Sequence, residues 1–283
     1  MKLFLLGEKK NIIILNCENK SIKNYFIKNN FNKKNDFKNL FRYGKTFNSR
    51  VGVYKGKDFY HCSSKGIYKN KNIFLENKFY DPHSIINYKD GFAITNTGRN
   101  EIVDEKGKII YKPNFLLKNN LKKDQIHLND CIEVEGKLLL TCLSYKREWR
   151  QNFSQGAIWF ENDFENKQKV YVPHTPKFYN ERIYLLETGH GQLISFDKNL
   201  KDKKIEAEGL NGFLRGLVIK DDCAYICSSK FNKTRTFANI HNCEKLYCEN
   251  GKIYKLNLKT KKLEIIYEKK GLNLFSIVEC NEK

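Results

Sequence analysis

Short apolar runs with polar residues at alternate positions follow one another along most of the chain. Runs of this kind, bounded by turn residues, predict β-strands. Only four prolines are present, and no long helical period interrupts the pattern, so the sequence predicts an all-β fold. We expect strands at Leu3–Leu6, Ile12–Leu15, Val51–Tyr54, Phe59–Cys62, Ser84–Tyr88, Phe92–Thr95, Glu101–Asp104, Asp130–Val134, Leu138–Leu143, Ala157–Phe160, Lys177–Tyr179, Ile183–Leu186, Leu193–Asp197, Leu217–Ile219, Ala224–Cys227, Lys252–Leu256 and Leu263–Tyr267.

Several gaps between these strands carry residues that favour tight turns. Asp-Gly and Asn-containing turns are typical of β-hairpins, because glycine and asparagine tolerate the left-handed backbone conformation that such turns require. The gaps are Lys89-Asp90-Gly91, Val134-Glu135-Gly136-Lys137, Tyr179-Asn180-Glu181 and Lys220-Asp221-Asp222. Each gap joins the first and second strands of a repeated unit.

Two phrases occur twice, which indicates an internal repeat. Arg50 leads to Cys62 and Arg215 leads to Cys227 with the same offset, since 62−50 = 12 and 227−215 = 12. A second pair has matching offsets as well: His83 leads to Gly98 (98−83 = 15), and His174 leads to Gly189 (189−174 = 15). One structural unit is therefore reused, with arginine or histidine at its first position.

The spacing of the repeats is typical of β-propeller blades. His127 lies between His83 and His174, giving steps of 127−83 = 44, 174−127 = 47 and 215−174 = 41 residues. A period in the forties with several strands per repeat is the signature of a propeller. Units that start at Arg50, His83, His127, His174 and Arg215 account for five blades.

A sixth blade would combine the N-terminal strands with Leu274–Glu279, which closes the ring and removes exposed sheet edges. We therefore expect residues 1–283 to form a single six-bladed β-propeller domain, with five or seven blades as the margin of the count. Residues 17–46 and 231–250 interrupt the rhythm. Insertions in propellers lie over one face, so residues 231–250 are either a lid or surface decoration.

Composition narrows the class of partner. The formal net charge is +20, from 52 Lys and Arg against 32 Asp and Glu. Lysine and asparagine are abundant together almost everywhere, and neither a recognition helix nor a stacking platform accompanies the charge. A solvated basic surface is therefore favoured over a nucleic-acid-binding surface.

Other bulk features set the expected environment. Nine cysteines, an odd number, fall mostly at strand positions, which favours packed free thiols over a disulfide framework. No apolar run approaches membrane-spanning length, and Met1–Gly7 is too short for a signal-peptide core. We expect a cytoplasmic protein.

The repeated first positions bring distant residues together. The innermost strands of a propeller line its central channel, so Arg50, His83, His127, His174 and Arg215 should lie around one mouth. Three neutral imidazoles, His83, His127 and His174, could bind Zn, Fe or Mn with an open position. Arg50 and Arg215 would then hold an anionic group. An anion site without metal and a purely structural role remain as alternatives.

Three further residues are weaker candidates for the substrate site. Asn129 lies two residues after His127 on the same strand face, where it could orient a ligand or cap the strand. His190 lies in a turn after a second strand, and either the channel rim or the open surface would accommodate it. Arg150 ends a basic and aromatic loop, 145–150, that could clamp an acidic or sugar-like ligand or simply be solvated.

Several phrases together resemble a bacterial family of propellers that is known as a domain of unknown function. They are Pro82-His83-Ser84, His127-Leu128-Asn129, Trp149-Arg150, Gly156-Ala157-Ile158-Trp159, Pro173-His174-Thr175-Pro176, Glu187-Thr188-Gly189-His190-Gly191-Gln192-Leu193 and Gly212-Phe213-Leu214-Arg215-Gly216-Leu217. The resemblance covers roughly residues 80–280. That family is distantly similar to the six-bladed strictosidine synthase and gluconolactonase group, which implies a metal site at the channel mouth. The histidines here replace the Glu, Asn and Asp of gluconolactonases, which argues against lactone hydrolysis.

Two functions follow from these features. The first is a metal-dependent hydrolase, lyase or isomerase that acts on an anionic small molecule, with His83, His127 and His174 as ligands and Arg50 and Arg215 as anion-orienting groups. The second is a non-catalytic propeller that binds a glycan or a protein partner through residues 145–150 and 231–250.

Overall fold

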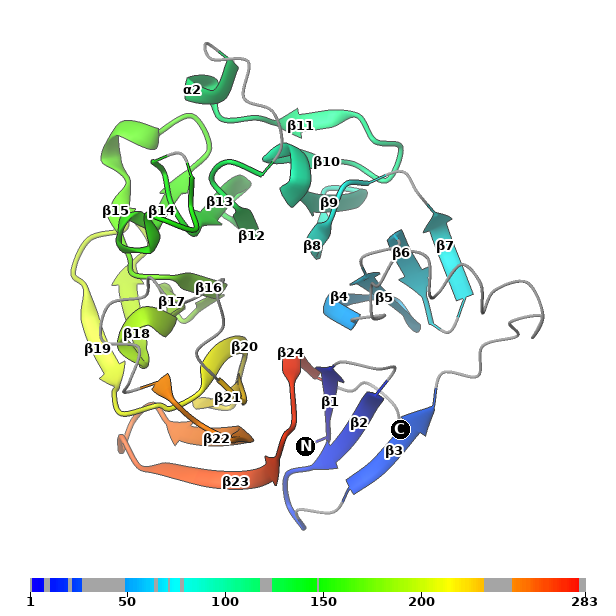
Figure 1. Cartoon of the computed structure of the whole chain (residues 1–283), viewed down its shortest axis with the longest axis vertical. Helices are drawn as coiled ribbons and strands as arrows, with labels where there is room; N and C mark the ends of the chain where they lie inside the picture. Colours follow the sequence, from blue (N-terminus) through cyan, green and yellow to red (C-terminus); the bar gives the residue numbers. More distant parts are fainter. Residues whose placement is uncertain are drawn as a thin grey trace.

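The computed structural model describes residues 2–7, 11–19, 22–26, 49–63, 66–70, 72–76, 79–117, 124–146, 148–231 and 246–279. Its described strands form six four-stranded antiparallel sheets arranged around a central axis (Figure 1). This arrangement is an all-β propeller and confirms the predicted fold class. Most of the predicted insertion at 231–250, namely residues 232–245, lies outside the described residues.

Each sheet is named here by its innermost strand. The β4 sheet contains β4 (Ser49–Lys55), β5 (Asp58–Ser63), β6 (Gly66–Lys69) and β7 (Asn72–Glu76). The β8 sheet contains β8 (Pro82–Tyr88), β9 (Gly91–Asn96), β10 (Glu101–Val103) and β11 (Ile109–Tyr111). The β12 sheet contains β12 (Leu128–Val134), β13 (Lys137–Cys142), β14 (Ala157–Phe160) and β15 (Gln168–Lys169).

The other three sheets follow the same order from the axis outward. The β16 sheet contains β16 (Pro173–Tyr179), β17 (Arg182–Glu187), β18 (Gln192–Asp197) and β19 (Lys204–Ala207). The β20 sheet contains β20 (Phe213–Lys220), β21 (Cys223–Ser229), β22 (Asn250–Asn257) and β23 (Leu263–Lys270). The β24 sheet contains β24 (Leu274–Glu279), β1 (Lys2–Gly7), β2 (Asn11–Asn16) and β3 (Ile22–Phe26).

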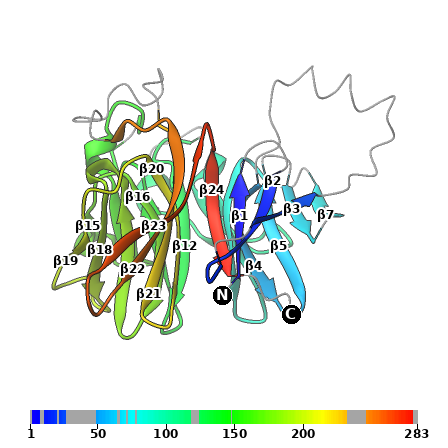
Figure 2. The ribbon, with the colours of Figure 1, turned by 90° about the horizontal axis from the view of Figure 1, so that it is seen from below.

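The two ends of the chain share the β24 sheet, as the sequence predicts. Strand β24 pairs antiparallel with β1, with Leu5 opposite Ile277 and Leu3 opposite Glu279 (Figure 2). Strand β24 also packs beside the innermost strands β20 and β4 of the neighbouring sheets. The last strand of the chain therefore supplies the innermost strand of the first sheet, and the ring is joined by hydrogen bonds between the termini.

Helical structure among the described residues is limited to one-turn segments. They are α2 (Asn114–Leu117) and the 3₁₀ turns η1 (Thr97–Arg99), η2 (Phe153–Gln155), η3 (Phe164–Asn166) and η4 (Thr188–His190). None of the helices in this part of the chain is long and apolar enough to span a membrane.

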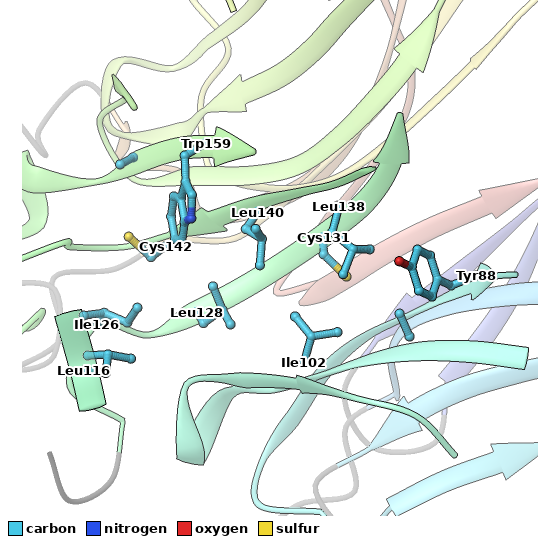
Figure 3. Close-up of a cluster of buried hydrophobic side chains, with 12 residues drawn as sticks. Tyr88, Ile102, Leu116, Ile126, Leu128, Cys131, Leu138, Leu140, Cys142 and Trp159 are labelled. Atoms are coloured by element: carbon cyan, nitrogen blue, oxygen red, sulfur yellow. The ribbon is translucent and has the colours of Figure 1, made fainter. Parts of the chain in front are cut away.

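Apolar side chains fill the spaces between neighbouring sheets. Between the β8 and β12 sheets, Ile102, Leu128, Leu140 and Trp159 are fully buried against one another (Figure 3). Comparable clusters lie between other pairs of neighbouring sheets, for example Leu186, Leu217 and Ile226 between the β16 and β20 sheets. Because these clusters come from alternating strand positions, the apolar periodicity of the sequence maps directly onto the packing between sheets.

The outer strands account for most of the strands missing from the prediction. Strand β19 is largely exposed, with only Glu206 buried in it, and β15 has two residues. Both strands are short, with four and two residues, and most of their side chains are not buried, so they leave no apolar run that the sequence could show. The cysteine prediction is confirmed for the described residues: Cys62, Cys131, Cys142 and Cys227 are buried and free, and Cys17, Cys223 and Cys248 are partly buried and free.

Candidate functional site

A cavity of about 240 Å³ lies where the innermost strands begin. It receives residues from β8, β12, β16, β20 and β24 and from the segments that flank these strands. Its lining residues are Asp81, His83, Asp124, His127, Asn129, Asp130, Leu143, Trp149, Arg150, His174, Thr175, Phe213, Arg215 and Phe275. Six of the site residues predicted from the sequence therefore line one cavity: His83, His127, His174, Asn129, Arg150 and Arg215.

A β-bulge near the start of each innermost strand shapes the cavity. The register shifts lie between Ser49 and Gly52, Pro82 and Ser84, Leu128 and Asp130, His174 and Lys177, Leu214 and Gly216, and, in β24, opposite Leu6 and Gly7. A bulge inserts an extra residue that lacks a partner in the ladder and re-aims its side chain. The same distortion therefore recurs around the axis at the residues that line the cavity.

Three equivalent hydrogen bonds, one in each of the β8, β16 and β12 sheets, show which residue of the β12 sheet corresponds to His83 and His174. The amides of Gly98, Gly189 and Ser144 donate to the carbonyls of Tyr80, Tyr171 and Ile126, so these three carbonyls are structurally equivalent. His83, His174 and Asn129 each lie three residues further on. The residue equivalent to the two histidines is thus Asn129. The prediction that His127 shares their position was wrong by two residues.

His127 instead occupies the turn before β12, equivalent to Asp81 and Val172. All three have left-handed backbones, with φ values of 51°, 55° and 55°. The structure also supplies the residue of the β24 sheet at the histidine position, Phe275, because Leu6 pairs with Ser276 and Gly7 with Leu274. Aligning Leu274-Phe275-Ser276 with Leu214-Arg215-Gly216 is the sequence signal that could have identified it.

His127 is held by a carboxylate and an indole. Its Nδ1 lies 2.9 Å and 3.0 Å from the two carboxylate oxygens of Asp124. The Nε1 group of Trp149 donates to Asp124 Oδ2 at 3.1 Å, and the Trp149 ring lies 4.2 Å from the His127 ring. Because a carboxylate only accepts hydrogen bonds, Nδ1 carries a hydrogen, and Nε2 is the nitrogen available to accept a proton.

His83 packs directly against His127. The two imidazole rings meet edge to face with their centroids 4.7 Å apart. Nδ1 of His83 lies 3.0 Å from the backbone carbonyl oxygen of Asp81, and 3.8 Å from that residue's Oδ2. Nδ1 of His83 is therefore a donor as well, and the two rings form one wall of the cavity.

His174 is held in a single tautomer by the backbone. Its Nδ1 lies 3.2 Å from the carbonyl oxygen of Val172 and 3.1 Å from Thr188 Oγ1. Burial, and then the charge of Arg215, lower the pKa of His174 to about 3, so the ring is neutral at physiological pH. The left-handed conformation of Val172, which is unusual for a β-branched residue, shapes the turn whose carbonyl accepts this bond.

Arg215 contacts two aromatic rings. Its Cζ lies 4.7 Å from the ring centroid of Phe213 and 4.3 Å from that of Phe275. Stacking engages the faces of the guanidinium, whereas its N–H groups lie in the plane. The arrangement fixes the orientation of the fork inside the cavity.

Arg150 lies at the cavity edge with its Cζ 4.3 Å from the Trp149 ring. It is exposed, whereas Trp149 is buried. Arg50 stands at the corresponding bulge of β4, but its side chain lies outside the described residues.

Two of the predicted substrate residues have other contacts. Asn129 is buried; its Nδ2 donates to the carbonyl oxygen of Pro173 at 2.6 Å and its Oδ1 accepts from Thr141 Oγ1 at 2.8 Å. It therefore joins the β12 and β16 sheets. The side chain of His190 is 55 % exposed, and its Nδ1 lies 3.3 Å from Glu187 Oε2, outside the cavity.

Asp130 is a buried carboxyl group that the sequence analysis did not single out. Burial raises its pKa to about 6, although Lys177, Ser84 and two backbone amides favour the charged form. Burial lowers the pKa of Lys177 in turn. Asp130 alternates with Ile132 and Val134 along the predicted strand, and an acidic residue on the same strand face as two apolar residues is the signal that could have identified it.

The predicted three-histidine metal site does not fit the observed donors. Among the residues that the structure describes, no group of three His, Cys, Asp or Glu side chains could hold a metal ion. His83, His127 and His174 share the cavity wall without forming such a group.

A comparison with protein families finds a match that covers most of the chain. The model of a domain of unknown function, DUF4915, matches residues 48–280. No curated protein matches this sequence.

Similar folds occur in solved structures of low sequence identity. A chain of a nidogen/laminin complex has a TM-score of 0.63 at 11 % identity, covering 98 % of this chain and 97 % of that one. A protein of unknown function from Bacteroides caccae has a TM-score of 0.57 at 13 % identity, with 98 % and 97 % coverage. Streptogramin B lyase has a TM-score of 0.50 at 10 % identity, with 93 % and 82 % coverage. At these identities the similarity shows the propeller fold alone.

Proposed function

The chain belongs to the DUF4915 family, whose function is unknown, and from the cavity itself we propose that it binds a small anionic molecule at the mouth of a six-bladed ring. In this proposal the anion lies against Arg215, and His127 accepts a proton from the bound molecule or from water beside it. Arg50, at the equivalent bulge of β4, is proposed as a second cation.

The position of Arg215 between Phe213 and Phe275 carries the proposal. An arginine in contact with two aromatic rings keeps its charge, because guanidinium does not lose its proton in proteins. It also loses little further conformational freedom on binding, since the rings already hold it. Carboxylates and phosphates match the planar fork in geometry and charge.

The size and lining of the cavity limit the ligand. A volume of 240 Å³ lies below the range of about 300–1,000 Å³ that is typical of small-molecule pockets. Aromatic rings and polar groups share the wall. A small organic acid fits this description better than a nucleotide or an oligosaccharide.

His127 is suited to act as a general base. Asp124 orients its imidazole and would stabilise the positive charge formed when Nε2 accepts a proton, as the carboxylate does in hydrolytic triads. The proton would come from a C–H group beside the acid, or from a water molecule that attacks an ester. Either step belongs to lyase, isomerase or hydrolase chemistry, and the geometry does not select among them.

Binding is the first test. Ligand-observed NMR with acetate, benzoate and inorganic phosphate should show that at least one acid binds wild-type protein, and that Arg215→Gln weakens binding at least tenfold. Arg182→Gln is the matched control, because Arg182 is occupied by Ser195 and Asp202 on a hairpin remote from the cavity. Failure of every acid to bind, or equal binding to Arg215→Gln, would contradict the proposal.

Catalysis is tested separately, with a panel of esters and of acids that can undergo elimination. Turnover that His127→Asn abolishes, while acid binding persists, supports an enzyme. Acid binding without turnover of any panel member supports a protein that binds small acids without converting them; this differs from the second function predicted from the sequence, a non-catalytic propeller that binds a glycan or a protein partner. Metal content of untagged protein tests the predicted Zn, Fe or Mn site in the same preparation.

A further inference from the structure

We propose that the cavity selects acids that carry a hydroxyl group next to the charged group, as in a 2-hydroxycarboxylate, with the anion on Arg215 and the hydroxyl donating to His174. This inference rests on the proposed function and specifies its substrate class. It follows from the hydrogen bonds that fix the His174 ring.

The hydrogen atom of His174 is on Nδ1. The Val172 carbonyl, 3.2 Å from Nδ1, can only accept a hydrogen bond. Thr188 Oγ1 has one hydrogen, which it donates to the carbonyl oxygen of Leu214 at 2.9 Å, so it accepts from His174 Nδ1 at 3.1 Å. Both contacts therefore require an Nδ1–H group. In the neutral ring, Nε2 then has a lone pair and acts as an acceptor.

His174 remains an acceptor throughout the physiological pH range. Burial and the neighbouring Arg215 charge keep the pKa of the ring near 3, far below the usual value for histidine. Arg215, in contrast, only donates. The two residues therefore present a fixed acceptor and a fixed donor on neighbouring innermost strands.

Two contacts fix the relative position of these residues. Thr175 Oγ1 donates to the backbone carbonyl oxygen of Arg215 at 2.5 Å, which joins β16 to β20. Phe213 touches both partners: its ring centroid lies 5.2 Å from that of His174 and 4.7 Å from Arg215 Cζ. The donor and acceptor are thus preorganised for one ligand that offers complementary groups.

Such a pair discriminates against related acids. An acid without the hydroxyl would displace water from Nε2 and leave that buried nitrogen without a hydrogen bond, which costs about 1–3 kcal/mol, or roughly five- to 150-fold in affinity. A methyl ether at the same carbon has no hydrogen to donate and meets the same penalty.

Mandelate, phenylacetate and O-methylmandelate test this inference, because they differ only at the 2-position. We expect isothermal titration calorimetry at pH 7.5 with EDTA to show that one enantiomer of mandelate binds at least tenfold more tightly than either analogue. His174→Phe removes the acceptor and should reduce mandelate binding to the level of phenylacetate. His190→Phe is the matched control, since His190 lies outside the cavity and should leave the preference unchanged.

The outcomes separate this inference from the proposed function. Equal binding of all three acids that Arg215→Gln abolishes would overturn hydroxyl recognition and leave the anion site intact. No binding of any of the three, while acetate, benzoate or phosphate still binds, would overturn the inference alone, whereas failure of every acid to bind would overturn both. If His174→Phe does not fold, ¹⁵N NMR of the wild-type ring gives a second measurement: the Nε2 resonance should be unprotonated at pH 6 and should shift with mandelate but not with phenylacetate. A protonated Nε2 at pH 6 would also overturn the inference.

Discussion

His127 Nδ1 donates to Asp124 at 2.9 Å, and Asp124 accepts a second hydrogen bond from the indole of Trp149. We expect Asp124→Asn to reduce the free energy of unfolding by about 1–3 kcal/mol, because an amide offers one acceptor oxygen to two donors and places its own N–H₂ group against one of them. Urea unfolding followed by tryptophan fluorescence measures this change.

Asp81→Asn is the control for that substitution. Asp81 also lies beside a cavity histidine and also has a left-handed backbone, which asparagine tolerates. Its carboxylate is 3.8 Å from His83 Nδ1 and 42 % exposed, so the change should cost less than about 0.5 kcal/mol. A similar decrease in the free energy of unfolding in both variants would show that the hydrogen bonds of Asp124 add no stability beyond that of an exposed aspartate.

Asn129 should contribute to stability more than to ligand binding. Asn129→Ala leaves the Pro173 carbonyl and the Thr141 hydroxyl without their partner inside the protein, which we expect to cost about 1–3 kcal/mol. Asn87→Ala removes a comparable bond, from Asn87 Nδ2 to the Tyr54 carbonyl at 2.8 Å, but at an exposed site where water can replace it. Denaturant midpoints that shift equally for the two variants would contradict the structural role of Asn129.

The sequence predicts the fold well because the strands that pack between neighbouring sheets can be recognised from short apolar runs. Second strands such as β17 bury side chains on both faces and appear as apolar runs, whereas outer strands such as β19 are short and leave most of their side chains unburied. The pairing of β24 with β1 was predictable because the strands at the two ends of the chain lie outside the five repeats, and pairing them closes the ring.

The site was less predictable because bulges and turns displace side chains by one or two residues. A histidine two positions before Asn129 looks like a member of the repeat, yet it lies in a left-handed turn and gains a carboxylate partner that follows no periodicity. For Phe275 the position could be predicted and the role could not. Its place follows from the repeat, but phenylalanine is not a residue type that indicates a binding site, and its role becomes evident only from the contact with Arg215.

Phe275 provides a test of that stacking. We expect Phe275→Ala to weaken binding of benzoate or mandelate by roughly two- to 30-fold, because it removes one of the two rings that orient Arg215, a cation–π contact of about 0.5–2 kcal/mol. Phe74→Ala, at a phenylalanine that is 42 % exposed on the outer strand β7, should leave binding unchanged. Isothermal titration calorimetry of both variants measures these affinities. An unchanged affinity in Phe275→Ala would contradict the role of the Phe275 ring in orienting Arg215.

Asp130 should make the stability of the protein depend on pH in mildly acidic solution. Its folded-state pKa of about 6 lies above the value of about 3.9 expected in the unfolded chain, so between these values the folded state binds more protons. The free energy of unfolding therefore falls as pH rises from about 4 to 6, by at most about 3 kcal/mol from this group, and the loss persists at higher pH. Asp130→Asn cannot titrate, so its stability relative to wild type should increase over that interval and then stay level.

Lys177 supplies a second measurement on the same carboxyl group. Its charge favours ionised Asp130, so Lys177→Met should raise the Asp130 pKa further and move the loss of stability to higher pH. Urea midpoints at half-unit pH steps, together with ¹³C NMR of the Asp130 carboxyl, follow both effects. A stability difference between Asp130→Asn and wild type that does not change between pH 4 and 7 would show that this aspartate titrates like an exposed one, and that water reaches it through the cavity.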